Sequence, residues 1–189
     1  MGDLYATKNQ RKYTNRKERN AFLLAAKDSP GPVRTLCHVI AMTGCRPSEA
    51  LALTSDCVDF GIGSLVFRTL KQRNAVRMRA IPVPPDLLAD LDLVYDIKAH
   101  QKKGEAVRLF PYTRQYVHKH VRAVMHKAGV YGPIACPRGL RHGFGVLAIE
   151  VAKDPWMVMK WLGHTDLKNT LVYMAAQGEE ERRAIAGTW

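Results

Sequence analysis

Residues 43–51 read TGCRPSEAL and hold the most informative pattern in the chain. Gly44 suits the left-handed end of one helix, and Pro47 suits the first turn of the next. Arg46 would therefore project from a helix N-terminus, where backbone donors and the helix dipole already favour an anion. Glu49 also favours the positive end of that helix. The segment predicts two helices joined by a tight turn that presents a cation.

The residues before this junction predict two helices. Thr14 is the expected N-cap of the first, which carries an apolar stripe made of Phe22, Leu23, Ala25 and Ala26. A break rich in proline and glycine at residues 28–32 should end this helix. The second helix then covers roughly residues 33–42 and ends at the glycine turn.

Beyond the junction, strands are followed by helices. Apolar and polar residues alternate enough over 65–68 and 76–83 to predict two short strands, joined by the polar turn Lys71-Gln72-Arg73-Asn74. Six later helices are expected. The first begins at Pro84-Pro85-Asp86, the second carries Val117, Val121, Val124, Met125 and Ala128, and the third runs from Pro137 to about Val151 and buries Phe144, Leu147, Ala148 and Val151. The fourth runs from Asp154 to Gly163, the fifth follows a cap at Thr165 or Asp166 and carries Tyr173, and the last begins at Glu179. The predicted fold class is mainly α with a small antiparallel β-sheet (α+β).

Composition indicates a basic protein with a core. The chain has 189 residues, 47% of them apolar, and 29 Lys and Arg against 17 Asp and Glu give a net charge of +12. Such an excess indicates a polyanionic partner, and DNA, RNA and anionic lipid all remain open on charge alone. No apolar stretch is long enough to span a membrane, and no secretory signal precedes the basic start. The scattered cysteines lack zinc-site spacing and are typical of reduced thiols in a cytosolic protein.

A few further residues at predicted element ends carry cations or nucleophiles. Arg138 and Arg141 are three positions apart and share one face of a helix. His164 lies in a break between helices, and Tyr173 follows it by nine residues on the next helix. Each has an ordinary alternative, because such residues are also found as solvated charges, turn caps or half-buried core aromatics.

Taken together, the motifs resemble those of the tyrosine recombinase (phage integrase) family. The segments at residues 43–51, Arg138-Gly139-Leu140-Arg141-His142 and Leu162-Gly163-His164-Thr165-Asp166, with Tyr173 after them, follow the family's order and spacing. Thr69-Leu70-Lys71 and the strand Arg79-Ala80-Ile81-Pro82-Val83 resemble its hairpin lysine and strand exit. The resemblance runs from about Tyr13 to Tyr173.

The resemblance implies a role for each residue of the motifs. Tyr173 would be the nucleophile, Arg46 and Arg141 would hold the nonbridging oxygens of the scissile phosphate, and Glu49 would support the arginines. Lys71 would protonate the leaving 5′-oxygen, and His164 would donate a hydrogen bond to the phosphate. Fixed positive charge suits a phosphodiester because negative charge grows on it during attack. A covalent phosphotyrosine conserves the bond energy, so neither a cofactor, a metal nor ATP is expected.

Two features depart from the family pattern. Arg138 stands where the family usually has a histidine, and an arginine cannot serve as a neutral base; it is expected to stabilise the phosphate, while His142 is expected to be structural. The resemblance begins near residue 13, which predicts a basic N-terminal arm over 1–12, one catalytic domain over 13–189 and no separate DNA-clamping domain. Other cations expected to position DNA are Lys8, Arg11, Lys12, Arg73, Arg77, Arg79, Arg114, Lys119 and Arg122.

The expected function is that of a site-specific DNA recombinase of the integrase, invertase or resolvase type. The resemblance implies double-stranded DNA as partner and a homotetramer on paired sites, with a monomer in the absence of DNA. It also implies a cytoplasmic, nucleoid-associated protein of prokaryotic, plasmid or phage origin. Two alternatives stay open: a non-catalytic DNA-binding accessory protein with the same fold, and a strand-relaxing enzyme similar to type IB topoisomerases.

Overall fold

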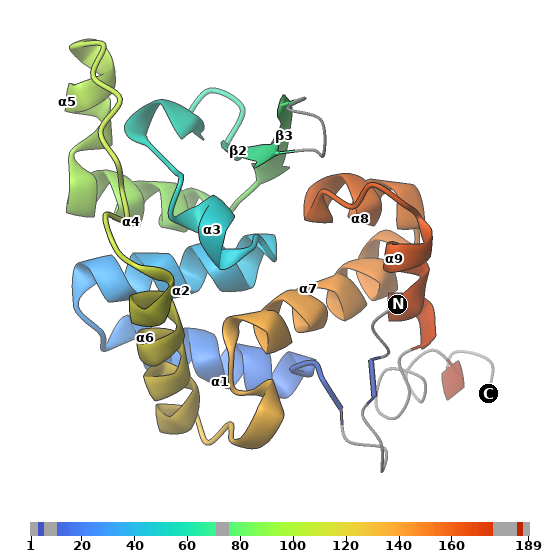
Figure 1. Cartoon of the computed structure of the whole chain (residues 1–189). Coiled ribbons are helices and arrows are strands. Elements are labelled where there is room, and N and C mark those ends of the chain that lie inside the picture. Colours follow the sequence, from blue (N-terminus) through green and yellow to red (C-terminus); the bar gives the residue numbers. More distant parts are fainter. Residues whose placement is uncertain (1–3, 6–10, 71–75, 176–184, 187–189) are drawn as a thin grey trace.

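The computed structural model describes residues 4–5, 11–70, 76–175 and 185–186, which form a mostly helical domain with a small sheet at one edge (Figure 1). The α-helices are α1 (Arg16–Lys27), α2 (Gly31–Thr43), α3 (Pro47–Ala50), α4 (Pro85–Tyr95), α5 (Ile97–Lys102), α6 (Arg114–Lys127), α7 (Pro137–Ala152), α8 (Pro155–Leu162) and α9 (Lys168–Leu171). Short 3-10 helices are η1 (Ser55–Cys57), η2 (Gly132–Ile134) and η3 (Val172–Ala175). None of the helices in these residues is long and apolar enough to cross a bilayer.

The sheet is antiparallel and has the strand order β1 (Val58–Asp59), β2 (Ser64–Leu70) and β3 (Val76–Pro82). Strands β2 and β3 form a hairpin whose register pairs Ser64 with Pro82 and Leu70 with Val76. The predicted class, mainly α with a small antiparallel sheet, is confirmed. The turn expected at residues 71–74 and the helix expected at Glu179 lie outside the described residues.

The junction at residues 43–51 forms as predicted. Gly44 ends α2 in the left-handed conformation, with φ of 61°, and Pro47 is the first residue of α3. A Cβ atom on Gly44 would lie 2.5 Å from the Phe144 ring of α7, so the glycine serves close packing as well as the turn. The Glu49 carboxylate accepts a hydrogen bond from the Arg46 backbone N–H at 2.8 Å. The first contact packs the end of α2 against α7, and the second fixes the start of α3.

Several local expectations are corrected by tertiary contacts. Asn15, not Thr14, caps α1, in a reciprocal capping box with Glu18. Thr14 is buried and its backbone N–H donates to the Gly139 carbonyl of α7 at 3.1 Å. Val151 is 67% exposed rather than buried, because it lies near the end of α7 and faces away from both apolar clusters of the domain.

Two later helix ends were also predicted. The Asp154 side chain caps α8, and Gly163 ends it with φ of 65°, as expected. Helix α9 instead begins after Leu167 without a side-chain cap. The Asp166 carboxylate accepts from the Lys168 backbone N–H in the preceding turn, at 2.9 Å.

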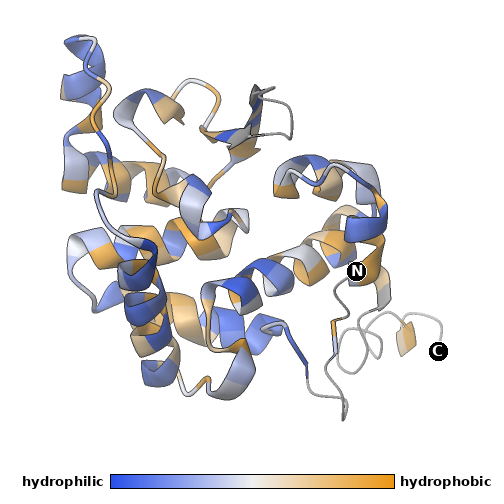
Figure 2. Cartoon of the chain, in the orientation of Figure 1, coloured by the Kyte–Doolittle hydropathy of each residue, from blue (hydrophilic) through white to orange (hydrophobic). Residues whose placement is uncertain are grey.

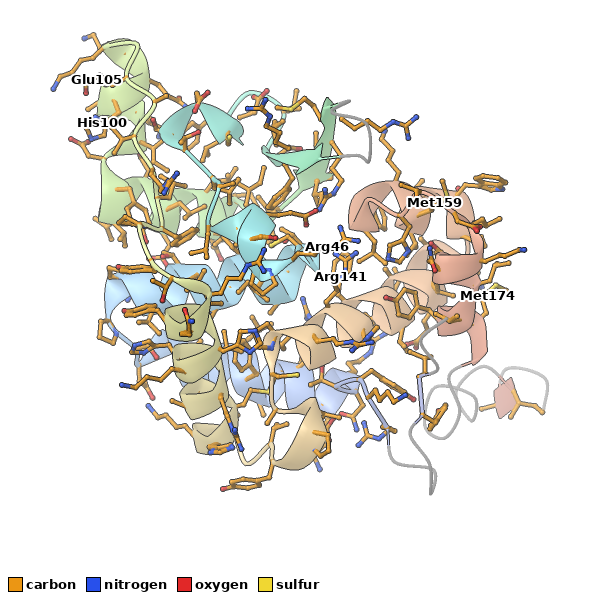
Figure 3. The ribbon with its side chains drawn as sticks, viewed as in Figure 1. Arg46, His100, Glu105, Arg141, Met159 and Met174 are labelled. Carbon is orange, nitrogen blue, oxygen red and sulfur yellow. The ribbon has the colours of Figure 1, made fainter. Side chains whose placement is uncertain are left out.

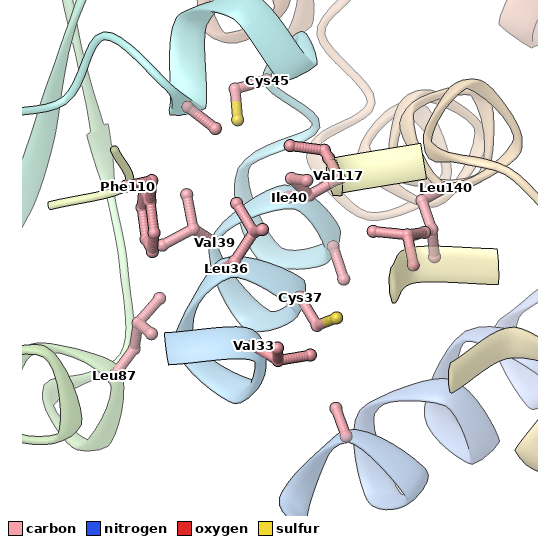
Figure 4. Close-up of a cluster of buried hydrophobic side chains, with 14 of the residues drawn as sticks. Val33, Leu36, Cys37, Val39, Ile40, Cys45, Leu87, Phe110, Val117 and Leu140 are labelled. Atoms are coloured by element: carbon pink, nitrogen blue, oxygen red, sulfur yellow. The ribbon is translucent and has the colours of Figure 1, made fainter. Parts of the chain in front are cut away.

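The main apolar core surrounds α2 (Figure 4). Leu36 and Ile40 are fully buried there, among side chains from α4, α6, α7 and the segment containing Phe110. Apolar residues alternate with hydrophilic ones around α6 and α7, as expected for helices with one face in a core (Figure 2). The arrangement makes α2 the axis on which the other helices pack.

A second apolar cluster lies where α7, α8 and η3 meet. It contains Tyr173 together with Tyr13, Val146 and Leu162. Leu4 belongs to it as well and is 2% exposed, and its carbonyl accepts from the Lys12 backbone N–H at 2.8 Å. Leu4, in the described part of the expected arm over residues 1–12, therefore packs on the domain.

Arg79 of β3 forms a buried ion pair with Glu49 of α3. Two hydrogen bonds of 3.2 and 2.7 Å join the guanidinium to the carboxylate, and Arg79 Nε donates to the Trp161 carbonyl of α8 at 2.9 Å. The expectation that Arg79 lies on the surface against DNA is wrong, because α8 covers it and only 6% of the residue is exposed. This side chain instead ties the sheet to α3 and α8.

The pKa of Glu49 lies below its ordinary value. Burial alone would raise it, but the hydrogen bonds and charge of Arg79, the Arg46 backbone N–H and the Arg46 charge together outweigh that effect. A carboxyl whose pKa is depressed in the folded chain contributes stability above its unfolded pKa. That contribution is lost as the pH falls through the folded value.

We expect Glu49→Gln to lower the free energy of unfolding by about 3 kcal/mol at pH 7, because it leaves a buried guanidinium without its counter-charge. The difference between parent and variant should shrink as the pH falls below about 4, where the parent's carboxylate is also neutralised. Urea unfolding at pH 7, 5 and 3 measures both effects.

Asp28→Asn is the matched control, because Asp28 pairs with Lys127 at 2.9 Å on the surface, with 71% of its side chain exposed. Its unfolding midpoint should equal that of the parent. Equal stabilities of parent and Glu49→Gln at pH 7 would show that the buried pair contributes nothing net.

Candidate active site

Most of the predicted catalytic side chains line one cavity of about 290 Å³. Its walls come from the N-cap of α3, from α7, from the turn after α8, and from α9 and η3. They are formed by Arg46, Arg138, Arg141, His142, His164, Asn169, Val172 and Tyr173. Figure 3 shows Arg46 and Arg141 pointing into the same space between α3 and α7. Arg46 and Tyr173, which the sequence separates by more than 120 positions, therefore line the same cavity. Lys71 lies outside the described residues.

Arg141 is the most deeply held cation of the cavity. It is 8% exposed, and its Nη1 and Nη2 donate to the carbonyls of Gly44 at 2.6 Å and Leu162 at 2.8 Å. Those carbonyls end α2 and α8, where helix dipoles favour positive charge. Burial and the nearby Arg46 charge lower the pKa of Arg141 to about 10, so it remains charged at neutral pH. A guanidinium has five N–H donors, so these two bonds leave others for an anion.

Arg46 is the exposed cation of the pair. Its Nη1 contacts the Glu49 carboxylate at 3.0 Å, and 43% of its side chain is exposed. Glu49 therefore supports Arg46 and Arg79; the hydrogen bonds of Arg141 go instead to backbone carbonyls. The predicted support of Arg46 by Glu49 has a direct geometric basis, and Arg79 is the third member of the group.

Tyr173 lies against α7 with little exposure to solvent. It is 3% exposed, and the ring fits because residue 145 is glycine: a Cβ there would lie 2.6 Å from the Tyr173 ring. Its hydroxyl lies 3.2 Å from Nδ1 of His142. Burial raises the pKa of the Tyr173 phenol, and the charges of Arg141, Arg46 and Arg138 oppose that rise. The free chain therefore holds a neutral phenol beside three guanidinium groups.

His164 lies beside the Tyr173 ring and lines the same cavity. Its ring is stacked with that of Tyr173 at 6.1 Å, and its Nδ1 lies 2.9 Å from the Thr170 hydroxyl. Burial, followed by the charges of Arg141 and Arg46, lowers the pKa of His164 to about 4. The imidazole is therefore neutral at pH 7, and the Thr170 contact fixes its orientation beside the cavity.

Arg138 and His142 form a second contact within α7. Arg138 Nε donates to Nε2 of His142 at 3.1 Å, and Arg138 is exposed. The expectation that His142 is only structural is incomplete, because this residue also contacts the phenol oxygen of Tyr173. The signal for it in the sequence is its spacing of four from Arg138, which places both side chains on one helix face.

Two larger hollows adjoin this cavity. One of about 480 Å³ is lined by Arg46, Arg114, His118 and Arg138, and one of about 640 Å³ by Arg46, Arg68 and His164. Arg68 and Asn169, which lines the larger hollow as well as the cavity, were not expected from the sequence. The cations extend the positive surface on both sides of Arg46, as a polyanion requires.

The cations expected to position DNA are found in different environments. Arg77, Arg114, Lys119 and Arg122 are exposed, and Lys12 is half-buried. Arg11 forms two hydrogen bonds of 3.0 and 2.9 Å to the Glu18 carboxylate. Lys8 and Arg73 lie outside the described residues. In the described part of the chain, no group of three or more His, Cys, Asp or Glu side chains is placed to hold a metal ion.

This arrangement suits chemistry on a phosphate ester. Three guanidinium groups and two neutral imidazoles line one small cavity, and Tyr173 lines it as well. Arginine's planar fork binds two phosphate oxygens at once and keeps its charge, so the cavity provides fixed positive charge beside a potential nucleophile.

Comparisons with known proteins find similar chains and folds among the recombinases. The chain is 25% identical over 163 residues to the tyrosine recombinase XerD of Lacticaseibacillus casei, covering 80% of this chain and 54% of that protein. Its fold matches the crystal structure of XerA recombinase with a TM-score of 0.78 at 19% identity, over 99% of this chain and 66% of that one. It also matches the XerH site-specific recombinase in a post-cleavage complex with its palindromic difH substrate, with a TM-score of 0.73 at 20% identity, over 93% and 52% of the two chains.

The chain thus spans about half the length of the XerD protein that it matches. The model of the phage integrase family matches residues 12–180, which include every motif described above. With the order of these motifs and the cavity that they form, this match shows that the chain belongs to the phage integrase family.

Proposed function

We propose that the chain is the catalytic domain of a site-specific DNA recombinase that cuts and rejoins strands through a covalent 3′-phosphotyrosine at Tyr173. The observation that carries the proposal is the shared cavity of Arg46, Arg141, His164 and Tyr173. The XerH match supports it, because that structure is of a site-specific recombinase in a post-cleavage complex with its substrate.

In the proposed reaction, a scissile phosphate enters the cavity between Arg46 and Arg141. Tyr173 Oη loses its proton and forms a bond to phosphorus, and the bond from phosphorus to the 5′-oxygen breaks. Lys71 gives a proton to that leaving oxygen. Rejoining reverses the step, with a 5′-hydroxyl displacing the tyrosine, so the energy of the phosphate ester is conserved throughout.

The arginines supply the main stabilisation in this scheme. Negative charge grows on the nonbridging oxygens as the phenol oxygen approaches, and guanidinium groups fixed beforehand stabilise it without reorganisation. Arg141 is fixed by two carbonyls, and Arg46 by Glu49. The neutral His164 would donate a hydrogen bond to the same phosphate.

The proposed partner is double-stranded DNA. Four copies of the protein would bind two DNA sites together. Exposed cations on α6 and β3 would contact neighbouring phosphates and set the position of the duplex without reading its sequence. Arg114 is the best placed of them, since it lines the same hollow as Arg46 and Arg138.

We expect Tyr173→Phe to abolish covalent attachment to DNA. The assay uses a nicked suicide duplex bearing the chain's site and looks for an adduct that survives denaturant, without added magnesium. Parent protein should form the adduct and the variant should form none, because the variant lacks the attacking oxygen.

Tyr131→Phe is the matched control, because that tyrosine is 65% exposed and does not line the cavity. It should form adduct at the parent's rate. Binding without any adduct by the parent would indicate an accessory DNA-binding protein, and relaxation of arbitrary supercoiled plasmid would indicate an enzyme similar to type IB topoisomerases.

Binding should depend strongly on salt. If about eight phosphates are contacted, the logarithm of the affinity falls with the logarithm of the salt concentration at a slope of about −7. Arg114→Gln should make this slope shallower by about 0.9, because one phosphate contact is lost. Fluorescence anisotropy of a labelled duplex over a range of salt concentrations measures the slope.

Lys127→Gln serves as the comparison, because Lys127 ends the same helix, roughly 20 Å along its axis from Arg114, and pairs with Asp28. It should leave the slope unchanged. Equal slopes for the parent and Arg114→Gln would mean that Arg114 faces no phosphate in the complex.

A further inference from the structure

A chain of hydrogen bonds connects Arg138 to the phenol of Tyr173 through one imidazole. Arg138 Nε donates to Nε2 of His142 at 3.1 Å, and Nδ1 of the same ring lies 3.2 Å from Tyr173 Oη. Arg138 and His142 are four apart on α7, and Tyr173 lies on η3, which packs against α7. The two rings are 5.8 Å apart.

The first of these bonds fixes the tautomer of the imidazole. A guanidinium has only N–H donors, so Nε2 of His142 must offer its lone pair to Arg138. In a neutral ring the other nitrogen then carries the hydrogen, so Nδ1 donates and Tyr173 Oη accepts. Because Arg138 occupies the only lone pair of the ring, His142 cannot also take a proton from the phenol.

The surroundings of the ring keep it neutral. The groups that face it are Tyr173 on η3, His164 after α8, Lys12 from the N-terminal segment, Arg46 on α3, Arg114 and His118 on α6, and Arg138 and Arg141 on α7 itself. Burial first, and then the charges of Arg138, Arg141 and Lys12, lower the pKa of His142 to about 4. No carboxylate is among the residues that line either hollow beside the ring.

We propose that His142 is a catalytic residue that donates from Nδ1 to the Tyr173 oxygen and stabilises it as a phenolate, and that Arg138 is the positioning residue that sets this tautomer. The inference rests on the proposed function for its reaction. It assigns Arg138 a task that differs from proton transfer, which an arginine cannot perform.

The proton balance of the step follows from this assignment. The phenol proton leaves to a water molecule in the open cavity, the bond from Oη to phosphorus forms, and the bond to the 5′-oxygen breaks. His142 keeps its Nδ1 hydrogen throughout. Its hydrogen bond is between neutral groups before proton loss and becomes charge-assisted afterwards, and bonds of the second kind are about twice as strong.

The kinetic test compares three variants by the rate of adduct formation on the suicide duplex across a range of pH. His142→Phe should slow the reaction at neutral pH by about tenfold to a hundredfold, and should move the rising limb of the rate to higher pH, because the phenolate loses its donor. His142→Asn should keep the rate within about threefold, since its amide N–H takes the place of Nδ1–H. His100→Phe, on α5 and far from the cavity in Figure 3, should match the parent.

A second measurement reads the tautomer without any reaction. Two-bond ¹H–¹⁵N correlations of the His142 ring at pH 7 should show the hydrogen on Nδ1 in the parent. In Arg138→Met they should show a mixture of both tautomers, because the donor to Nε2 has gone. This spectrum is recorded on the free chain and does not depend on DNA or on a reaction.

The outcomes separate the inference from the proposed function. A hydrogen on Nε2 in the parent spectrum overturns the inference, and so does a His142→Phe variant with the parent's rate and pH profile. A parent protein that forms no adduct overturns the proposed function instead. The spectrum then still decides whether Arg138 sets the tautomer.

Discussion

The two hydrogen bonds from the Arg141 guanidinium to the carbonyls of Gly44 and Leu162 hold the domain and its site together. A buried charge is costly unless it is fully paired, and here the partners are the C-terminal ends of two helices. One side chain of α7 therefore fixes the relative positions of α2, α8 and the cavity between them. Removing it would leave both helix ends unsatisfied.

The rest of the cavity depends on contacts of the same kind, in which another protein group holds a charged side chain in position. Glu49 fixes Arg46 and Arg79, and Arg79 reaches the Trp161 carbonyl next to Leu162. Arg46 and Arg141 are therefore each held by protein groups before any substrate arrives. A substrate phosphate meets charges that are already in place, and such preorganisation is what a developing negative charge needs.

Sequence reasoning predicted the parts of this structure that are encoded locally. Gly44, Pro47 and Gly163 mark helix ends because of their backbone preferences, and those ends are where the chain has them. Sequence reasoning did not predict the burial of Arg79, because the helix that covers it, α8, lies about 80 residues further along the chain. Helical spacing suggested that Val151 is buried, but spacing gives no information on where a neighbouring element stops.

The sequence predicted which residues form the site, but much less about the contacts between their side chains. The family pattern named Arg46, Arg141, His164 and Tyr173, and these four line one cavity. It gave His142 no part in the chemistry, because a motif records which residues recur and not which atoms meet. The contact between His142 and the Tyr173 hydroxyl appears only when α7 and η3 are packed together.

The neutrality of both imidazoles has a consequence for the electric field in the cavity. With the pKa values of His142 and His164 near 4 and that of Arg141 near 10, no side chain with one of these shifted values changes its charge between about pH 5 and 9. These three side chains therefore contribute the same charge to the cavity throughout that interval.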